Sequence, residues 1–169
     1  MMKNQLIVGV MGGGIADRES TEAAYRLGNL IAAQGWILLN GGRNAGIMAA
    51  SARGARENGG ITVGILPDDH PRAVSPFIQI PILTGMGNAR NCINVLSSHV
   101  VVACPGGTGT ISEIALAIKT SRPVILLNFD IQEMFQRCLK TEKLFAVRTP
   151  EEVIATIKEI FKSVIEPGK

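Results

Sequence analysis

The chain has 169 residues, of which 46% are hydrophobic, 18% charged and 4% aromatic, with a formal net charge of +3. The apolar fraction and the low charge exclude an intrinsically disordered chain. The longest apolar runs fall far short of the roughly 20 residues of a membrane-spanning helix. Few aromatic residues and no basic run disfavour nucleic-acid binding. Three cysteines without a CxxC pair argue against a disulfide framework or a zinc site, so we expect a cytoplasmic protein.

The first half of the chain alternates apolar runs with amphipathic stretches. Apolar runs that stop at glycine, asparagine or proline predict strands at residues 5–11, 36–39, 62–66 and 77–83. Apolar residues at helical spacing, followed by a glycine, predict a helix over residues 20–34. A second predicted helix, over residues 46–58, is rich in small side chains, which let a helix approach a sheet closely. Prolines and two aspartates indicate a loop over residues 67–76.

The second half continues the alternation. Asn88 predicts the N-cap of a helix that runs to about residue 97. Residues 99–104 are the most continuously apolar stretch and predict a strand buried on both faces. A glycine loop joins this strand to a predicted helix over residues 110–119. The remaining predicted elements are strands at 123–128 and 144–147, a helix at 131–139, and a last helix opened by the capping box of residues 149–152.

This order of elements predicts the fold class. Strands that alternate with helices are typical of an α/β protein with a parallel sheet. We therefore predict a Rossmann-like, doubly wound, mainly parallel sheet with helices on both faces. No linker, repeat or low-complexity segment interrupts the chain, so we expect a single ligand-binding domain over residues 1–165, followed by a C-terminal tail of residues 166–169.

Three glycine clusters, at residues 12–14, 41–42 and 106–109, each follow a predicted strand. Ligands of open parallel sheets bind outside the carboxyl ends of the strands, and a helix N-terminus there offers free N–H groups to an anion, most often a phosphate. Glycines at such turns can also serve only to let the chain turn tightly, and three clusters at one edge favour the phosphate. Neither a GxGxxG spacing nor a P-loop motif is present, which disfavours a dinucleotide site and a P-loop ATPase.

Two charged residues accompany the glycine clusters. Glu113 completes the capping-box pattern of residues 110–113, so it is either a structural glutamate or a carboxylate beside the anion, facing a sugar or a heterocycle. Arg90 lies in the first turn of a predicted helix, where the helix dipole disfavours a cation. It is therefore either a solvated surface arginine or the partner of an anion, and the latter is favoured. Arg43 and Asn44 are weaker candidates of the same kind.

Three further residues are less suited to a site. Cys104 ends the most apolar strand and is expected to be a buried, inert thiol, although it would lie near a ligand. His99 begins the same strand, at the edge away from the predicted site. His70 lies in the acidic loop and is expected to be a surface residue.

Two motifs resemble a known family. Residues 105–113, Pro-Gly-Gly-Thr-Gly-Thr-Ile-Ser-Glu, resemble the P-G-G-x-G-T-x-x-E signature of the Lonely Guy proteins, which are often labelled lysine decarboxylase-like. Residues 41–48 resemble their second glycine motif, G-G-x-x-x-G-x-M. The resemblance implies a Rossmann-like domain that forms dimers or tetramers. The decarboxylase label lacks physical support, because no lysine for a pyridoxal phosphate Schiff base stands among the glycine loops.

The resemblance leaves two activities open. Lonely Guy enzymes hydrolyse the N-glycosidic bond of cytokinin riboside 5′-monophosphates with the motif glutamate and an Arg-Lys pair. Glu113 and Arg90 match these residues and would be catalytic in this alternative, but Asn91 stands at the lysine position. The stretch of residues 87–91 and the compact length look more like the molybdenum cofactor carrier proteins, which bind the phosphorylated pterin cofactor without transforming it.

The sequence therefore favours a protein that binds, protects and carries the molybdenum cofactor, and it leaves open whether the chain is an enzyme. The cofactor is then cargo, with molybdoenzyme apoproteins as candidate recipients and with no metal ion bound by the protein itself. The residues expected to bind the ligand are Gly12, Gly13, Gly41, Gly42, Asn44, Arg90, Gly106, Gly107, Thr108, Gly109, Thr110 and Glu113.

Overall fold

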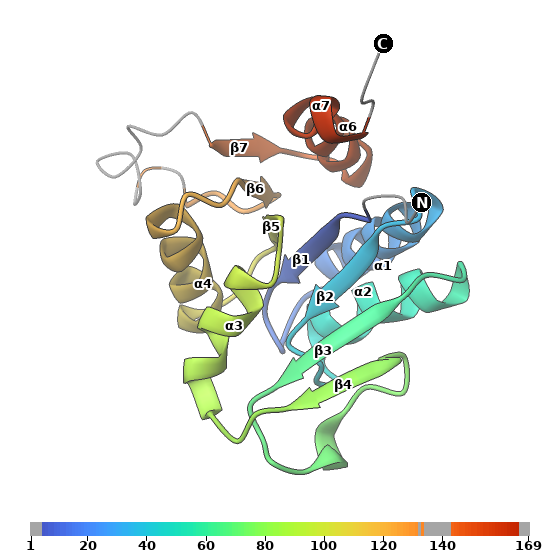
Figure 1. Cartoon of the computed structure of the whole chain (residues 1–169), viewed down its shortest axis with the longest axis vertical. Helices are drawn as coiled ribbons and strands as arrows, with labels where there is room; N and C mark the ends of the chain where they lie inside the picture. Colours follow the sequence, from blue (N-terminus) through green and yellow to red (C-terminus); the bar gives the residue numbers. More distant parts are fainter. Residues whose placement is uncertain (1–4, 132, 134–142, 166–169) are drawn as a thin grey trace.

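The computed structural model describes residues 5–131, 133 and 143–165 and contains one sheet (Figure 1). Its strands are β1 (Ile7–Met11), β2 (Ile37–Asn40), β3 (Thr62–Leu66), β4 (Ile80–Leu83), β5 (Val100–Ala103), β6 (Val124–Leu127) and β7 (Leu144–Val147). They lie in the order β4-β3-β2-β1-β5-β6-β7, and every neighbouring pair is parallel. The chain thus moves outward from β1 to β4, returns to β5 beside β1, and continues to β7. The predicted doubly wound, parallel α/β fold is confirmed.

Helices cover both faces of this sheet (Figure 1). The described helices are α1 (Arg18–Ala33), α2 (Gly46–Glu57), α3 (Asn91–Leu96), α4 (Thr108–Lys119), α6 (Pro150–Ile160) and α7 (Lys162–Ile165), with short 3-10 turns η1 (Pro71–Ala73) and η2 (Gly87–Arg90). Leu27 of α1, Ile47 of α2 and Val153 of α6 share one apolar cluster with the sheet. Val95 of α3 and Ile114 of α4 belong to the cluster on the other side. We call these two sides the α1 face and the α3 face. No described helix is long and apolar enough to span a membrane.

The small residues of α2 allow close packing against α1 rather than only against the sheet. A Cβ atom at Gly28 of α1 would collide with the carbonyl oxygen of Ser51, and one at Gly54 of α2 would collide with that of Tyr25. Backbone thus meets backbone at both glycines. Any larger side chain at either position must push the two helices apart.

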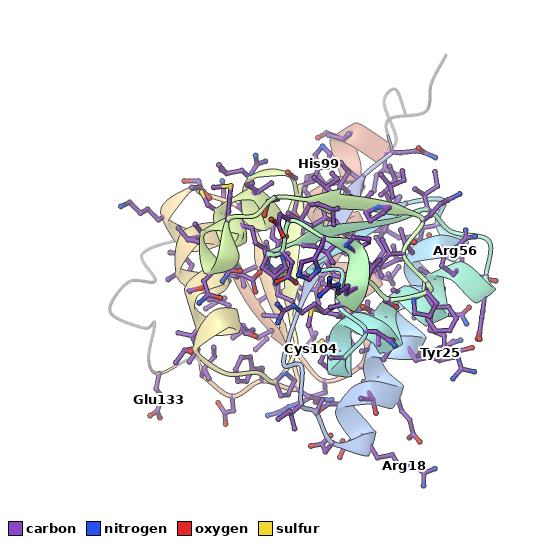
Figure 2. All side chains as sticks on the ribbon, turned by 90° about the horizontal axis from the view of Figure 1, so that it is seen from below. Arg18, Tyr25, Arg56, His99, Cys104 and Glu133 are labelled. Atoms are coloured by element: carbon purple, nitrogen blue, oxygen red, sulfur yellow. The ribbon has the colours of Figure 1, made fainter. Side chains whose placement is uncertain are left out.

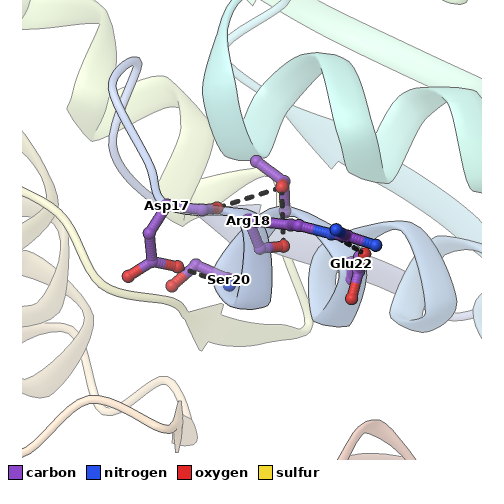
Figure 3. A network of polar contacts seen from close by, with 5 residues as sticks. Asp17, Arg18, Ser20 and Glu22 are labelled. Carbon is purple, nitrogen blue, oxygen red and sulfur yellow. Dashed lines mark hydrogen bonds and ion pairs between the residues drawn. The ribbon is translucent and has the colours of Figure 1, made fainter.

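The best-defined helix starts are set by side-chain caps. The carboxylate of Asp17 accepts a hydrogen bond of 2.7 Å from the backbone N–H of Ser20, and α1 therefore begins at Arg18, two residues before the predicted start (Figure 3). The predicted capping box of Thr149 and Glu152 is present at the start of α6. Both observations follow the known preference of oxygen-bearing side chains for the N-cap position.

Some local predictions are wrong. Asn88 does not cap a helix, because it lies inside η2 and α3 begins three residues later without a side-chain cap. Helix α4 begins at Thr108, not at residue 110, because Gly107 already has extended backbone and serves as the N-cap. The predicted loop of residues 67–76 contains η1. The predicted helix over residues 131–139 lies outside the described residues.

Candidate functional site

A cavity of about 180 Å³ opens at the carboxyl ends of β1 and β5, where the strand order reverses. This is the edge at which open α/β sheets bind their ligands. Three glycine loops and η2 contribute to it. Its lining residues are Val10, Met11, Gly12, Gly13, Gly14, Gly41, Met48, Asn88, Arg90, Asn91, Gly107, Gly109, Thr110 and Glu113.

Eight of the twelve predicted ligand-binding residues line this cavity and four do not. The eight are Gly12, Gly13, Gly41, Arg90, Gly107, Gly109, Thr110 and Glu113. Gly42 donates its backbone N–H to Asn40 at 2.8 Å and takes a positive φ of 75°, so it shapes the loop from behind. Asn44 is exposed, Gly106 packs against Thr110, and Thr108 lines an adjoining groove.

The glycine loops are tied to one another by backbone hydrogen bonds. Gly13 donates its N–H to the carbonyl of Pro105 and accepts from the N–H of Ile47, both at 3.0 Å. Behind the second loop, the buried amide of Asn40 donates to the carbonyl of Met48 at 2.9 Å. A Cβ atom at Gly12 would overlap Ile47, so glycine is required there for close packing. The loops after β1, β2 and β5 therefore form one connected wall.

The N-terminus of α4 lies beside the cavity and offers backbone N–H groups that can bind an anion. No side chain caps this helix, and its first residues, Thr108, Gly109 and Thr110, begin beside the cavity. A Cβ atom at Gly107 or Gly109 would meet nothing within 4 Å, so the space in front of the helix start is open. Free N–H groups and the positive end of the helix dipole favour a bound anion at such a place.

Arg90 brings a positive charge to the same cavity. Its guanidinium lies against Gly41, where a Cβ atom would collide with Nη1, and its buried Nε has no hydrogen-bond partner among the described residues. Burial lowers the pKa of Arg90, and the field of Glu113 opposes this effect. No carboxylate of the described part of the chain lies within ion-pair distance of it. Arg90 is therefore a half-buried cation that has no counter-ion among the described residues.

Arg43 is engaged elsewhere. Its guanidinium forms an ion pair of 3.0 Å with Asp68, and its backbone makes an isolated bridge with Val74. This pair braces the loop beside the cavity, and Arg43 is not among the lining residues.

Glu113 does not serve as a capping residue. Because α4 begins at Thr108, Glu113 lies in the second turn, 6% exposed, and lines the cavity. Its Oε1 accepts a hydrogen bond of 2.7 Å from Nδ2 of Asn94. Burial raises the pKa of Glu113, whereas the Asn94 hydrogen bond and the charge of Arg90 lower it. The capping role predicted as one alternative for Glu113 is wrong, and Glu113 lines the cavity instead.

Sequence reasoning missed the roles of two asparagines on α3. Nδ2 of Asn91, 8% exposed, donates to Ser112 at 2.9 Å and thereby ties α3 to α4. Asn94, one turn further along, is fully buried and holds Glu113. The available signal was the spacing of these two polar residues, which places them on one side of a short, otherwise apolar helix.

The remaining candidates are not among the residues that line the cavity. Two of them, Cys104 and His99, are labelled in Figure 2. Cys104 is buried, which raises the pKa of its thiol to about 12, and it lines a separate cavity with Asp17 and Ser20. His99, at the other end of β5, accepts a hydrogen bond of 2.9 Å from the backbone of Ile7. His70 is exposed. Within residues 5–131, 133 and 143–165, no three His, Cys, Asp or Glu side chains cluster as metal ligands.

Solved structures with this architecture include cofactor carriers. The chain is 49% identical to the molybdenum cofactor binding protein of Rippkaea orientalis, over 94% of this chain and 98% of that one, with a TM-score of 0.89. It is 42% identical to the Moco carrier protein of Chlamydomonas reinhardtii, over 95% and 99% of the two chains, with a TM-score of 0.86.

A more distant relative has the other activity suggested by the motifs. The chain is 32% identical to a cytokinin riboside 5′-monophosphate phosphoribohydrolase of Mycobacterium marinum, over 57% of this chain and 52% of that protein. This match therefore spans about half the length of the hydrolase. A model of the SLOG cluster4 family matches residues 5–154. The resemblance to carriers and Lonely Guy proteins is thus confirmed, and the chain belongs to the SLOG cluster4 family.

Proposed function

We propose that this protein binds, protects and carries the molybdenum cofactor, a phosphorylated pterin. The observation that carries the proposal is Arg90, a half-buried guanidinium with no counter-ion among the described residues, which lines the same cavity as the uncapped start of α4. A phosphate would satisfy both groups at once, because charge-assisted hydrogen bonds to arginine and to helix N–H groups are strong. The likeness to two cofactor-binding carriers over nearly the whole chain supports the pterin as the organic part.

Different residues of the cavity would bind different parts of the cofactor. The backbone N–H groups of residues 108–110 and the guanidinium of Arg90 would hold the phosphate. Glu113 would face the organic part, because a carboxylate next to a phosphate is repelled unless a proton or a hydrogen-bond donor intervenes. The metal belongs to the cargo, and the protein supplies anchoring and shelter for it.

A nucleotide phosphoribohydrolase is the alternative function. Glu113 favours it, since a buried carboxyl group with a raised pKa beside an anion site is suited to acid–base chemistry. Asn91 weighs against it: the residue is neutral and is already engaged with Ser112, whereas the Lonely Guy pattern has a lysine. An N-glycosidase must also stabilise an oxocarbenium-like sugar, which requires a complete polar network around the carboxylate.

The proposal includes an oligomer of even order, a homodimer or homotetramer, in the cytoplasm. Ile80 and Ile82 of the edge strand β4 are exposed, and their register with Val63 and Ile65 places them on the α3 face. Leu96 of α3 is exposed as well. A second copy covering these side chains would remove apolar surface from water. A stable species of 18.0 kDa in sedimentation at micromolar concentration would contradict the oligomer.

The cargo is tested by uptake and transfer. We expect the purified protein to retain the molybdenum cofactor and to hand it to a cofactor-free nitrate reductase. Arg90→Gln should weaken retention roughly ten- to hundredfold, because one charge-assisted contact to the phosphate is lost. Arg72→Gln, at an exposed arginine of η1, is the matched control and should retain the cofactor normally.

The alternative is tested on the same preparation. If the protein releases free base from adenosine monophosphate or its N6-prenylated form at enzyme-like rates, if Glu113→Gln abolishes the release, and if no cofactor is retained, the carrier function is wrong. Retention of the cofactor without base release would support the carrier.

A further inference from the structure

The carboxyl group of Glu113 has two oxygens in different surroundings. Oε1 accepts the hydrogen bond from Nδ2 of Asn94 at 2.7 Å, in the interior between α3 and α4. Oε2 makes no hydrogen bond to the described residues, and Glu113 itself lines the cavity. Arg90, from η2, is the charged group of the described chain whose field reaches this carboxyl. One oxygen is therefore held by the protein, and the other is available to a ligand.

Only one end of the Asn94 amide, Nδ2, is hydrogen-bonded to the described residues. The side chain is fully buried, and its Oδ1 has no hydrogen-bond partner among the described residues. The nearby hydroxyl of Ser98 donates to the backbone carbonyl of Asn94, at 2.7 Å, and not to this oxygen. A buried acceptor without a donor is uncommon in folded proteins and calls for a physical reason.

The reason lies in the shape of an amide. Its two ends are nearly identical in size, but one is a donor and the other an acceptor. A charged carboxylate needs the donor end, as the structure has it. A protonated carboxyl group needs the acceptor end, and a half-turn of the Asn94 amide would bring Oδ1 to Oε1 to accept that proton. The same side chain can therefore hold Glu113 in both protonation states.

We propose that Asn94 is a positioning residue that holds Glu113 in both protonation states. When an anion binds, Oε1 of Glu113 takes up a proton and donates it in a hydrogen bond to Oδ1 of Asn94, which neutralises the carboxylate. Oε2 continues to accept a hydrogen bond from the ligand. The proton comes from the solvent and returns to it on release. The ligand that suits this site is an organic phosphate with an N–H or O–H donor beside the phosphate. The proposal deepens the proposed function and rests on it only for the identity of the cargo.

Burial of Glu113 supports this arrangement, because burial already raises the pKa of the carboxyl group and a bound dianion would raise it further. Anion binding and proton uptake are therefore linked. The affinity for a dianion should fall as the pH rises, with the uptake of up to about one proton per site.

The experiment uses sulfate, which stays a dianion throughout the pH range, and protein labelled with ¹³C at the glutamate carboxyl and ¹⁵N at the asparagine amide. We expect the Glu113 signal, identified by its loss in Glu113→Gln, to titrate at a higher pH with sulfate than without it. We expect the side-chain amide signals of Asn94 to titrate with the same midpoint as Glu113, and to stop titrating in Glu113→Gln. Amide signals that stay constant through the Glu113 titration would overturn the proposal.

Asn94→Leu adds a second test, with Ser98→Ala as the matched control. The leucine removes the donor that Oε1 uses in the structure, and this hydrogen bond lowers the pKa of Glu113, so the titration should shift upward. Ser98→Ala removes a buried hydrogen bond of the same helix end without touching the carboxyl group, and should leave the titration unchanged. Equal titrations in Asn94→Leu and wild type would contradict the role of Asn94. Because these readouts involve no cofactor, a protein that titrates as expected but fails to retain the cofactor would refute the carrier function alone.

Discussion

The two faces of the sheet are built in different ways. On the α1 face, helices approach until backbone meets backbone at Gly28 and Gly54, and side-chain caps open α1 and α6. On the α3 face, α3 and α4 have no side-chain caps, and buried polar residues replace part of the apolar packing. The α1 face stabilises the fold through close packing. Within the described part of the chain, the α3 face has no side-chain caps on α3 and α4 and no counter-ion for Arg90, which leaves backbone N–H groups and a cation without protein partners.

The largest expected effect is a loss of stability from a substitution on the α1 face. In Gly54→Ala, the new Cβ atom collides with the carbonyl oxygen of Tyr25, a backbone atom that cannot move without shifting α1. We expect a loss of about 3 kcal/mol or more in the free energy of unfolding, measured by urea denaturation, because overpacking a tight core forces backbone shifts.

The matched control for this variant is Gly109→Ala on the other face. Its Cβ atom meets nothing within 4 Å, in the first turn of α4. Alanine is a better helix former than glycine, so this variant should be as stable as the wild type or more stable by up to about 1 kcal/mol. Equal losses in the two variants would mean that the faces do not differ in packing.

A smaller effect concerns the polar α3 face. Burial raises the pKa of Glu113 in the folded state, so its contribution to stability is full at low pH and is lost as the pH rises from 4.5, its ordinary pKa, through the folded value. Glu113→Gln removes this loss, and its amide can also donate to the unpaired Oδ1 of Asn94. We expect the variant to match the wild type at pH 4 and to be more stable at pH 7, measured by chemical denaturation.

A variant that is less stable than the wild type at pH 7 would contradict this account. It would mean that the carboxylate stabilises the α3 face despite its burial. The stabilisation by Glu113→Gln should come with weaker function in either proposed role, as is common for residues that serve a ligand.

The smallest effect concerns an exposed cap of the α1 face (Figure 3). The hydrogen bond from Ser20 lowers the pKa of Asp17, so the stabilisation by this cap is present above pH 3.8, its ordinary value, and is lost as the pH falls through the folded pKa. We expect Asp17→Ala to lower the melting temperature slightly at pH 7 and not at pH 2. Arg18→Ala, which removes the exposed ion pair with Glu22, should leave it unchanged at both.

The contrast between the faces also explains what the sequence could predict. Strands and the fold class follow from apolar runs, because central parallel strands are buried on both sides and carry an unmistakable pattern. The start of α6 was predicted from its capping box at Thr149, and the start of α2 was predicted at Gly46 although no side chain caps it. The start of α1 was placed two residues late despite its Asp17 cap. The starts of α3 and α4 were missed as well, and neither helix has a side-chain cap.

The position of the cavity was predicted, but not all of its lining residues were. Glycine clusters at strand ends, Arg90 and Glu113 converge there because parallel strands bring their carboxyl ends to one edge. Four residues fall outside for separate reasons: Gly42 bonds back to Asn40, Asn44 is exposed, Gly106 packs against Thr110, and Thr108 lines an adjoining groove. Asn94 was missed because its role depends on a contact between α3 and α4; its spacing from Asn91 indicates a shared polar side of α3 but does not identify Glu113 as the partner.

The return of the chain from β4 to β5 has a consequence for synthesis. Strand β1 gains its second neighbour only when β5 is made, and Ile7 then bonds His99, which lies 92 residues further along. A growing chain that has not reached β5 contains Arg90 but lacks the start of α4, and β1 is still an open edge. Contacts between such distant residues carry a large loop-closure cost and are typical of slow folding. The complete cavity therefore exists only after β5 has joined β1, when Arg90 and the start of α4 line it together, so a ligand of this cavity can bind only a chain whose two halves have met.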